Sequence, residues 1–433
     1  MRFFLRLLAL LAILAAASFS WVILGGVMSQ RTGTQQMELY GRVNDLWGEP
    51  QQQQAPRFTF SWVELVESTN LLTDDRGRVV LDASGRPVRD VQPVTHTLVG
   101  RASQSVITAD LTLDQRRKGL MWYSLYDVAF GGTWSYTHNE PQAGSVNFTL
   151  ALPSQSGSYD RFRLLVDGVD VSARAAPQGG AITTDVPVEP GQTVVFETGW
   201  TSRGMDRWSY QPTEGTSQIE DFSLTMTTDF ADIDFPNKTM SPSTRVETAA
   251  GWELVWRFDR LVTGDGMGMV MPSRIQPGPL AAEMSFTAPI SLVLFTAWIT
   301  VLGLLRKVEI HPVNHFFLAA AFFSFHLLFG YSADRLPVEW AFALSSAVSV
   351  VLVVSYLRLV VGPRFALVEA GLAQLLYLVG FSLAHFWEGS TGLTLTVLGI
   401  LTLFALMQLT GRIRWSEVFG GGEGARRSGA PVG

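Results

Sequence analysis

Long uncharged apolar runs divide this chain into three parts. One run of 22 residues lies near the N-terminus, from Leu7 to Met28, and the next begins only after residue 285. Five runs then follow closely, at 288–305, 313–331, 338–357, 365–386 and 391–410. Each is near the ~20 residues that an α-helix needs to cross a hydrocarbon core about 30 Å thick. The sequence therefore predicts six membrane-spanning helices, one before and five after a long polar segment.

The first run has a competing interpretation as a signal peptide, because residues 15–17 (AAA) resemble a cleavage site. The apolar sequence continues past that site through residues 21–24 (WVIL). A complete span favours an uncleaved anchor.

Basic residues indicate the orientation of the spans. With the N-terminus inside, the two short outer loops carry one base, Arg335. The inner segments then carry Arg2, Arg6, Arg306, Lys307, Arg358, Arg364, Arg412, Arg414, Arg426 and Arg427. Because cytoplasmic loops are enriched in Lys and Arg, this pattern predicts that both termini are cytoplasmic. It also predicts that the polar segment lies outside.

The polar segment, residues 29–286, holds 21 basic and 31 acidic residues. Apolar residues alternate with polar ones over 146–152, 162–166, 222–226 and 252–258, and turn residues such as Asp167-Gly168 separate the runs. A period of two indicates half-buried strands, and many short strands favour an antiparallel β-sandwich. Residues 30–90 are less regular, and a short helix over 34–47 is compatible with them.

These patterns predict an α+β membrane protein with six transmembrane helices, one plus five. A large extracytoplasmic antiparallel β-sandwich is inserted between helices one and two. The expected parts are an N-terminal anchor (1–28), a periplasmic β-rich domain (29–286), a five-helix transmembrane bundle (287–411) and a disordered cytoplasmic tail (412–433).

Composition and missing motifs exclude several chemistries. The chain has no cysteine and a net charge of −6, which argues against thiolate chemistry and against nucleic acid as a partner. It contains no HExxH, GxSxG, SxxK or Walker pattern. Asp229, Asp232 and Asp234 lack the spacing of an EF-hand calcium loop. We therefore expect no enzyme activity, no cofactor and no metal site.

One aromatic-rich stretch, residues 200–210, is the candidate contact loop of the polar segment. Aromatic faces offer broad apolar contact, while Arg and Asp orient polar ligands, so a glycan is one candidate partner. The competing interpretation is a stiffened loop in which an arginine stacks on Trp208. The candidate residues are Trp200, Arg203, Asp206, Arg207, Trp208 and Tyr210.

Four titratable residues fall within the predicted spans or at their ends: His315, His326, Glu369 and His385. Such groups are expensive in lipid, and a proton path through His326 and Glu369 would indicate a proton-coupled transporter. The alternative is structural packing, since His315 and Glu369 lie near the inner interface. Packing is favoured because the five C-terminal spans show neither breaks nor repeated halves.

The C-terminal spans resemble those of the CreD family of bacterial inner-membrane proteins. The resemblance rests on residues 310–315 (IHPVNH) after the Arg306-Lys307 pair, on 355–358 (SYLR) and on 410–415 (TGRIRW). It covers nearly the whole chain in plan and is most specific between about 286 and 415.

The resemblance implies a role in cell envelope integrity and stress response, tied to a two-component regulon and to tolerance of envelope-directed agents. It implies no enzymatic activity and supplies no catalytic residues. The expected partners are the lipid bilayer and either an envelope glycan or another envelope protein, in an oligomeric state that the sequence leaves open.

Overall fold

The computed structural model describes residues 2–75, 77–118, 121–387, 389 and 391–411. The predicted tail at 412–433 lies outside these residues. The chain divides into two compact units. The helical unit contains Met1–Leu39, Arg117–Met121 and the chain from Ile275 onward, and the β-domain contains Tyr40–Arg116 and Trp122–Arg274.

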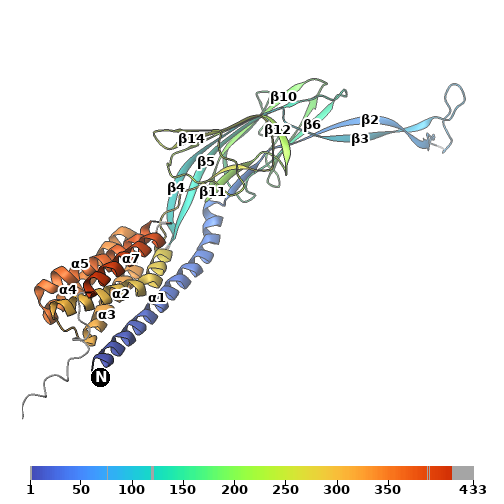
Figure 1. Cartoon of the computed structure of the whole chain (residues 1–433). Helices are drawn as coiled ribbons and strands as arrows, with labels where there is room; N and C mark the ends of the chain where they lie inside the picture. The colour runs from blue at the N-terminus through green and yellow to red at the C-terminus, as the bar shows by residue number, and fades with distance from the viewer. Residues whose placement is uncertain (1, 76, 119–120, 388, 390, 412–433) are drawn as a thin grey trace, which may run out of the picture. The chain divides into compact units, whose positions relative to one another are not determined.

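Six helices in the described part of the chain are long and apolar enough to cross a membrane, which confirms the predicted number. Short connections join the last five, and Figure 1 shows them labelled from α2 to α7. The helices are α1 (Arg2–Trp47), α2 (Pro277–Arg306), α3 (Pro312–Ser332), α4 (Val338–Val361), the composite helix 365–386 and α7 (Thr391–Thr410).

Helix α1 is longer than the predicted anchor, which ended at residue 28. It continues through the polar residues 34–47, the stretch that is compatible with a separate short helix, and ends before Gly48. Gly48 has a φ of +111°, and a Cβ there would lie 2.5 Å from the carbonyl oxygen of Arg203. Because neither proline nor a cluster of glycines interrupts residues 29–47, the helix has no reason to stop earlier.

The helix over residues 365–386 is not a regular α-helix. It contains two π-helical stretches, η1 (Phe365–Ala370) and η2 (Leu375–Gly380), on either side of α5 (Gly371–Gln374). It ends in α6 (Phe381–Leu383) and the 3₁₀ turn η3 (Ala384–Phe386). The helix stays continuous from residue 365 to residue 386. Its widened turns were not predicted, since apolar length alone does not encode them.

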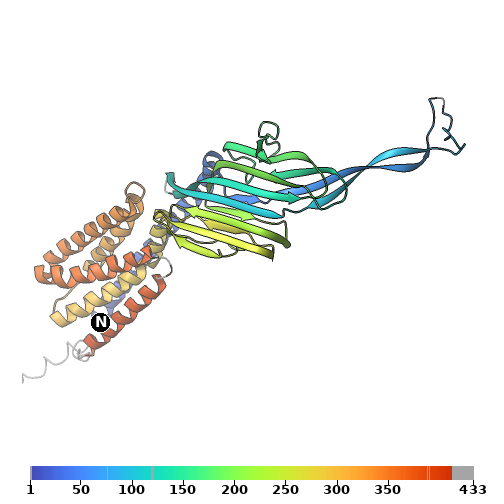
Figure 2. The ribbon, with the colours of Figure 1, turned by 90° about the horizontal axis from the view of Figure 1, so that it is seen from above.

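The β-domain contains fifteen described strands in three sheets, and all of them lie in sequence between α1 and α2. The strand orders are β1-β11-β15, β13-β14-β12-β4-β5-β10-β7-β8 and β3-β2-β6-β9. Figure 2 shows the long strands of the eight-stranded sheet lying side by side. The bounds are β1 (Gln51–Gln54), β2 (Arg57–Leu71), β3 (Arg89–Gly100), β4 (Gln104–Lys118), β5 (Met121–Thr137), β6 (Gly144–Ala151), β7 (Tyr159–Val166), β8 (Val169–Asp170), β9 (Ala181–Val188), β10 (Thr193–Met205), β11 (Arg207–Gln211), β12 (Ser217–Thr228), β13 (Thr244–Glu247), β14 (Trp252–Thr263) and β15 (Met267–Val270).

The four alternating runs that predicted strands lie on β6, β7, β12 and β14, except that the first run extends one residue past the end of β6. Their apolar residues enter one core that draws buried side chains from all three sheets. Phe148 of the four-stranded sheet stacks on Phe196 of the eight-stranded sheet, with ring centroids 4.6 Å apart. This shared core holds the sheets together.

The sheets are mixed rather than purely antiparallel. β12 pairs with β4 in parallel, and β1 pairs with β11 in parallel. Alternation predicts that a strand exists but does not name its neighbour, and the long chain between β4 and β12 permits a parallel crossover. The predicted antiparallel arrangement is therefore wrong at these two pairings.

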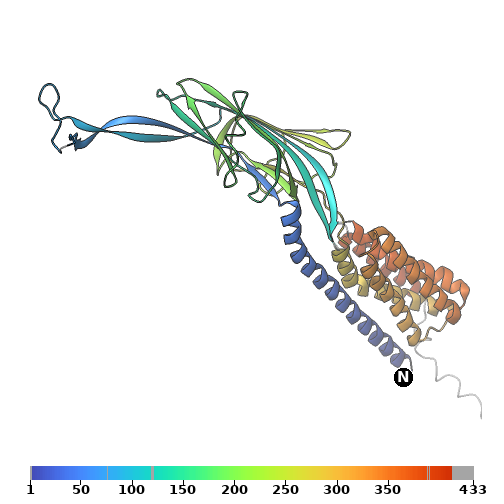
Figure 3. The ribbon, with the colours of Figure 1, turned by 180° about the vertical axis from the view of Figure 1, so that it is seen from behind.

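A two-stranded ribbon formed by β2 and β3 projects from the rest of the β-domain (Figures 1 and 3). Phe58 and Phe60, near its base, enter the core, and Trp62 packs against it. Farther out, Val63 is 62 % exposed and Leu65 is 71 % exposed. The outer ribbon therefore contributes no side chain to the core among the described residues.

Candidate binding groove

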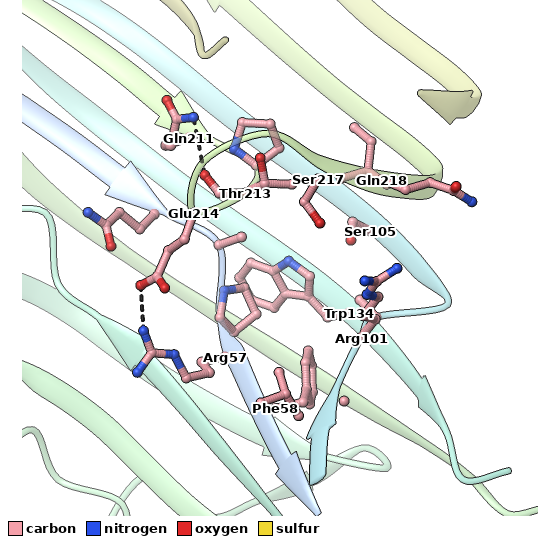
Figure 4. A pocket seen from close by; sticks show the side chains of 18 of the residues that line it. Arg57, Phe58, Arg101, Ser105, Trp134, Gln211, Thr213, Glu214, Ser217 and Gln218 are labelled. Atoms are coloured by element: carbon pink, nitrogen blue, oxygen red, sulfur yellow. Dashed lines mark hydrogen bonds and ion pairs between the residues drawn. The ribbon is translucent and has the colours of Figure 1, made fainter. Parts of the chain in front are cut away.

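The candidate site is a groove in the β-domain where the four-stranded and eight-stranded sheets separate (Figure 4). Its larger part has a volume of about 590 Å³, which is typical of ligand sites in proteins. Its walls come from the chain around Gln54–Phe58, from residues 99–105, from the turn 211–215 and from the start of β12.

One wall of the groove is an open strand edge. β12 pairs with β14 from Ser217 onward but pairs with β4 only from Phe222, because β4 begins at Gln104. Among the described residues, the outward edge of Ser217–Glu220 thus has no neighbouring strand. The two strands separate at Asp221, which has a φ of +42° and accepts a hydrogen bond from Gln104 Nε2 over 2.6 Å.

The opposite wall is also a sheet edge, because β3 is the outermost strand of its sheet. A smaller hollow of about 240 Å³ continues along it. The two hollows share five residues and so lie next to each other, and we call them together the strand-edge groove. The shared residues are Val99, Gly100, Arg101, Ala102 and Glu220.

Charges in the strand-edge groove are paired except at two positions. Arg57 Nη2 lies 2.5 Å from Glu214 Oε1, and Arg260 Nε lies 3.4 Å from Glu220 Oε1. Arg101 is exposed and has no carboxylate partner in the described chain. Glu140, at the far end of the smaller hollow, is likewise unpaired there. Arg101 is therefore the free cation of the groove.

Aromatic side chains form the floor of the strand-edge groove, but these side chains are buried. Trp134 is 1 % exposed and Phe58 is 2 % exposed. Trp134 Nε1 donates to the Tyr210 hydroxyl over 3.4 Å, which fixes the indole from behind. These rings close the floor, but their faces are not open to stack on a ligand.

The predicted contact loop at 200–210 is not a loop. Its residues lie on β10 and β11, apart from Asp206 between them, and Trp200, Trp208 and Tyr210 are between 1 and 3 % exposed. Burial raises the pKa of the Tyr210 hydroxyl well above its usual range. The prediction of an aromatic contact surface is wrong, because alternation along the two strands turns these rings into the core.

The charged residues of this stretch have separate partners and do not stack on Trp208. Arg203 Nε donates to Asp127 over 2.9 Å, which raises the pKa of the guanidinium, and both line a polar hollow of about 410 Å³. Asp206 accepts a hydrogen bond from Tyr40 over 2.9 Å. Burial raises the pKa of the Asp206 carboxyl. Arg207 is exposed.

Two of the four predicted polar residues of the spans lie close together. His326 is buried, its Nδ1 lies 3.1 Å from the Phe322 carbonyl oxygen, and its ring meets Trp21 edge-on at 5.6 Å. His385 Nε2 lies 2.9 Å from Thr287 Oγ1. The two histidines are near enough to interact electrostatically.

The other two lie elsewhere in the helical unit. Glu369 forms an ion pair with Arg306 over 2.9 Å, and His315 Nε2 lies 3.5 Å from Thr300 Oγ1. No hydrogen bond within the described residues joins His326 to Glu369. The structure therefore does not bring the proposed proton pair together.

The buried side-chain amide of Gln374, which was not among the four predicted polar residues of the spans, joins three helices. Gln374 Nε2 donates to Ser349 Oγ over 3.0 Å, and that hydroxyl donates to the Ala321 carbonyl oxygen over 2.7 Å. Gln374 Oε1 has no hydrogen-bond partner among the described residues. The uncharged glutamine inside a span is the sequence signal that could have marked this position.

Sequence reasoning missed the strand-edge groove entirely. Arg57, Arg101 and Glu214 lie far apart in sequence and form no motif. The groove arises from the staggered starts of β4 and β12, which depend on pairing. Elsewhere, the Asp229 carboxylate accepts from the Leu113 amide over 2.8 Å, and no cluster of metal-ligating side chains occurs among the described residues.

Comparisons with known proteins place this chain in no family. No family model matches the sequence, and no curated protein matches it. Among solved structures, one match is the crystal structure of a "putative nutrient binding protein" from Legionella pneumophila, with a TM-score of 0.28 and 8 % identity. It covers 46 % of this chain and 73 % of the other. The fold and site together define a multi-helix, membrane-type protein with a large β-domain.

Proposed function

We propose that this chain is a multi-pass protein of the bacterial inner membrane, related to the CreD family, that supports cell envelope integrity and the response to envelope stress. It acts by binding or scaffolding through its β-domain rather than by catalysis. The observation that carries the proposal is the combination of six membrane-length helices with a β-domain that holds an elongated polar groove.

The helix ends support the orientation in this proposal. Arg306 ends α2 and Lys307 follows it. Arg358 lies in the last turn of α4, and Arg364 lies in the connection from α4 to the composite helix. The connection from α3 to α4 carries Arg335 as its single base. Basic residues thus favour the cytoplasm for the α2–α3 connection, for the connection from α4 to the composite helix and for both termini. The β-domain is then periplasmic.

Deletion and complementation test the role in the envelope. Loss of the gene should increase the uptake of a hydrophobic fluorescent dye and the sensitivity to envelope-directed agents, and the full-length chain should restore both. Arg174→Glu, at an exposed position outside the groove, should complement fully. Unchanged permeability in the deletion strain under several envelope stresses would contradict the proposal.

A glycan-binding module remains a second candidate, now at the strand-edge groove rather than at 200–210. Its support is the cluster of groove amides and hydroxyls, from residues such as Gln54, Gln218 and Ser217, which match sugar hydroxyls. Full-length protein in detergent should then sediment with purified peptidoglycan, and Arg101→Glu should abolish the sedimentation. Equal sedimentation of Arg101→Glu and Arg174→Glu would remove this candidate.

A proton-coupled transporter keeps one specific observation in its favour. The π-helical stretches η1 and η2 are of a kind that often occurs at functional sites. If the helices conduct protons, His326→Ala or Glu369→Gln should abolish proton flux in proteoliposomes. Flux equal to that of protein-free liposomes in the unaltered chain would eliminate this function.

A further inference from the structure

We infer that the strand-edge groove binds an extended peptide segment of another envelope protein, which adds as a strand to the open edge of β12 and places an acidic side chain against Arg101. The inference rests on the proposed function and deepens it, because it names the chemical class of the partner.

The first argument is the unpaired backbone at Ser217–Glu220. A strand edge presents N–H and C=O groups that pair readily with an added strand, which is how many domains bind extended peptides. Here the edge borders a groove instead of open solvent, because β4 begins beside Phe222. The backbone can therefore supply affinity while the groove walls select side chains.

The second argument is shape. The two hollows share the chain from Val99 to Ala102, so the groove follows the edge of β3 as well as that of β12. An extended segment fills such an elongated space, whereas a compact ligand would leave part of it empty. Figure 4 shows Ser217 and Gln218 on one side and Arg57 and Phe58 on the other.

The third argument is charge. Arg57 pairs with Glu214, and Glu220 pairs with Arg260. Arg101 and Glu140 have no such partner among the described residues, so Arg101 is the cation available to a ligand. The segment 29–286 carries ten more acidic than basic residues, so it repels strongly acidic chains at long range. A peptide with one acidic side chain beside Arg101 pairs with the free cation. If the rest of the peptide has a low net charge, the acidic domain does not repel it strongly.

The fourth argument separates a peptide from a glycan. Sugar rings are commonly held on open aromatic faces, but Trp134 and Phe58 are covered at the floor of the groove. Trp200 and Trp208, which could have formed such a platform, lie in the core. An open strand edge without an open aromatic face therefore favours a peptide.

Selection from a displayed library of random octapeptides on the full-length protein in nanodiscs tests this inference. Enriched peptides should be rich in strand-forming residues and carry Asp or Glu at one fixed position. Arg101→Glu should weaken a selected peptide about tenfold or more, and replacing the peptide's acid by Lys should restore binding to that variant. Methylation of alternate peptide nitrogens should also abolish binding, because it removes strand hydrogen bonds.

Two further variants complete the experiment. Ser105→Trp should block the groove by size, whereas Arg174→Glu, an equal charge change outside it, should leave binding intact. All variants should melt at the temperature of the unaltered protein. The inference is overturned if no peptide is enriched, or if the two Glu variants bind the selected peptides equally.

Purified peptidoglycan fragments are the competing probe. If they bind in an Arg101-dependent manner while peptides do not, the peptide inference is wrong but the proposed function stands. If the deletion strain shows no envelope defect, the proposed function fails whatever the peptide result.

Discussion

At the scale of single residues, Asp206 shows how one side chain meets two demands. It joins β10 to β11 with a φ of +65°, a conformation that Asp and Asn tolerate better than most residues. Its carboxylate accepts a hydrogen bond from Tyr40, while burial raises the pKa of the carboxyl above its ordinary value of 3.8. The folded protein therefore holds this proton more tightly than the unfolded chain does.

Asp206→Asn should remove a pH-dependent loss of stability. A raised pKa in the folded state means that Asp206 favours folding below its ordinary pKa and favours it less as pH rises through the folded pKa. The melting temperature of Asp206→Asn, relative to that of the unaltered chain, should thus increase from about pH 4 to about pH 7. Tryptophan fluorescence of the detergent-solubilised protein measures this.

The comparison variant is Asp206→Ala, which loses both the acceptor and the tolerance of positive φ. Relative to Asp206→Asn, which also lacks the titrating carboxyl, it should be destabilised by about 1–2 kcal/mol at every pH. A melting-temperature difference between Asp206→Asn and the unaltered chain that stays constant with pH would contradict the burial argument.

Trp208 separates the sequence prediction from the structure. As a contact residue it could be removed without harm to the fold, but it is buried in the core of the β-domain. Trp208→Ala should therefore cost about 3–5 kcal/mol of unfolding free energy. Its exposed neighbour serves as the control, since Arg207→Ala should change stability by no more than about 0.5 kcal/mol. Equal denaturation midpoints for the two variants would show that Trp208 is not in the core.

At the scale of elements, the ribbon of β2 and β3 is the part least explained by the core. An isolated two-stranded ribbon is marginally stable in water, and its exposed apolar residues include Val63, Leu65, Val91, Val94 and Val99. Exposed apolar surface of this kind marks an interaction site or a risk of aggregation. The outer ribbon therefore adds little to the stability of the β-domain.

Shortening the ribbon tests this directly. Val63 and Thr95 face each other in the register, so residues 64–94 can be replaced by Asn-Gly, which forms a two-residue hairpin turn. The melting temperature should change by a few degrees at most, since no core side chain is removed. A shortened protein that fails to fold would show that the outer ribbon is needed for the β-domain.

Sequence patterns predicted elements better than they predicted pairings. Alternation located β6, β7, β12 and β14, because the period of the side chains is set locally. The parallel pairing of β4 with β12 was beyond reach, because it joins segments more than a hundred residues apart. The prediction of the site was wrong for the same reason. Trp200 and Trp208 stand out in the local sequence as aromatic residues, whereas Arg101 lines a groove only because β4 and β12 start at different positions.

At the scale of the whole molecule, the number of apolar helices followed from the lengths of the apolar runs in the sequence, since a helix needs about 20 apolar residues to cross a bilayer. The polar end of α1 and the π-helical stretches did not follow, because both depend on local backbone geometry. The proposed function requires a defined sidedness: we propose that the β-domain and the α3–α4 connection face the periplasm, while the α2–α3 connection faces the cytoplasm.

Labelling of single cysteines tests that claim most directly, because the natural chain contains no cysteine. The exposed positions are Arg174 in the β-domain, Glu309 between α2 and α3, and Arg335 between α3 and α4. In intact spheroplasts, a membrane-impermeant maleimide should label Arg174→Cys and Arg335→Cys, and should label Glu309→Cys only after permeabilisation. Equal labelling of Arg174→Cys and Glu309→Cys before permeabilisation would contradict the account.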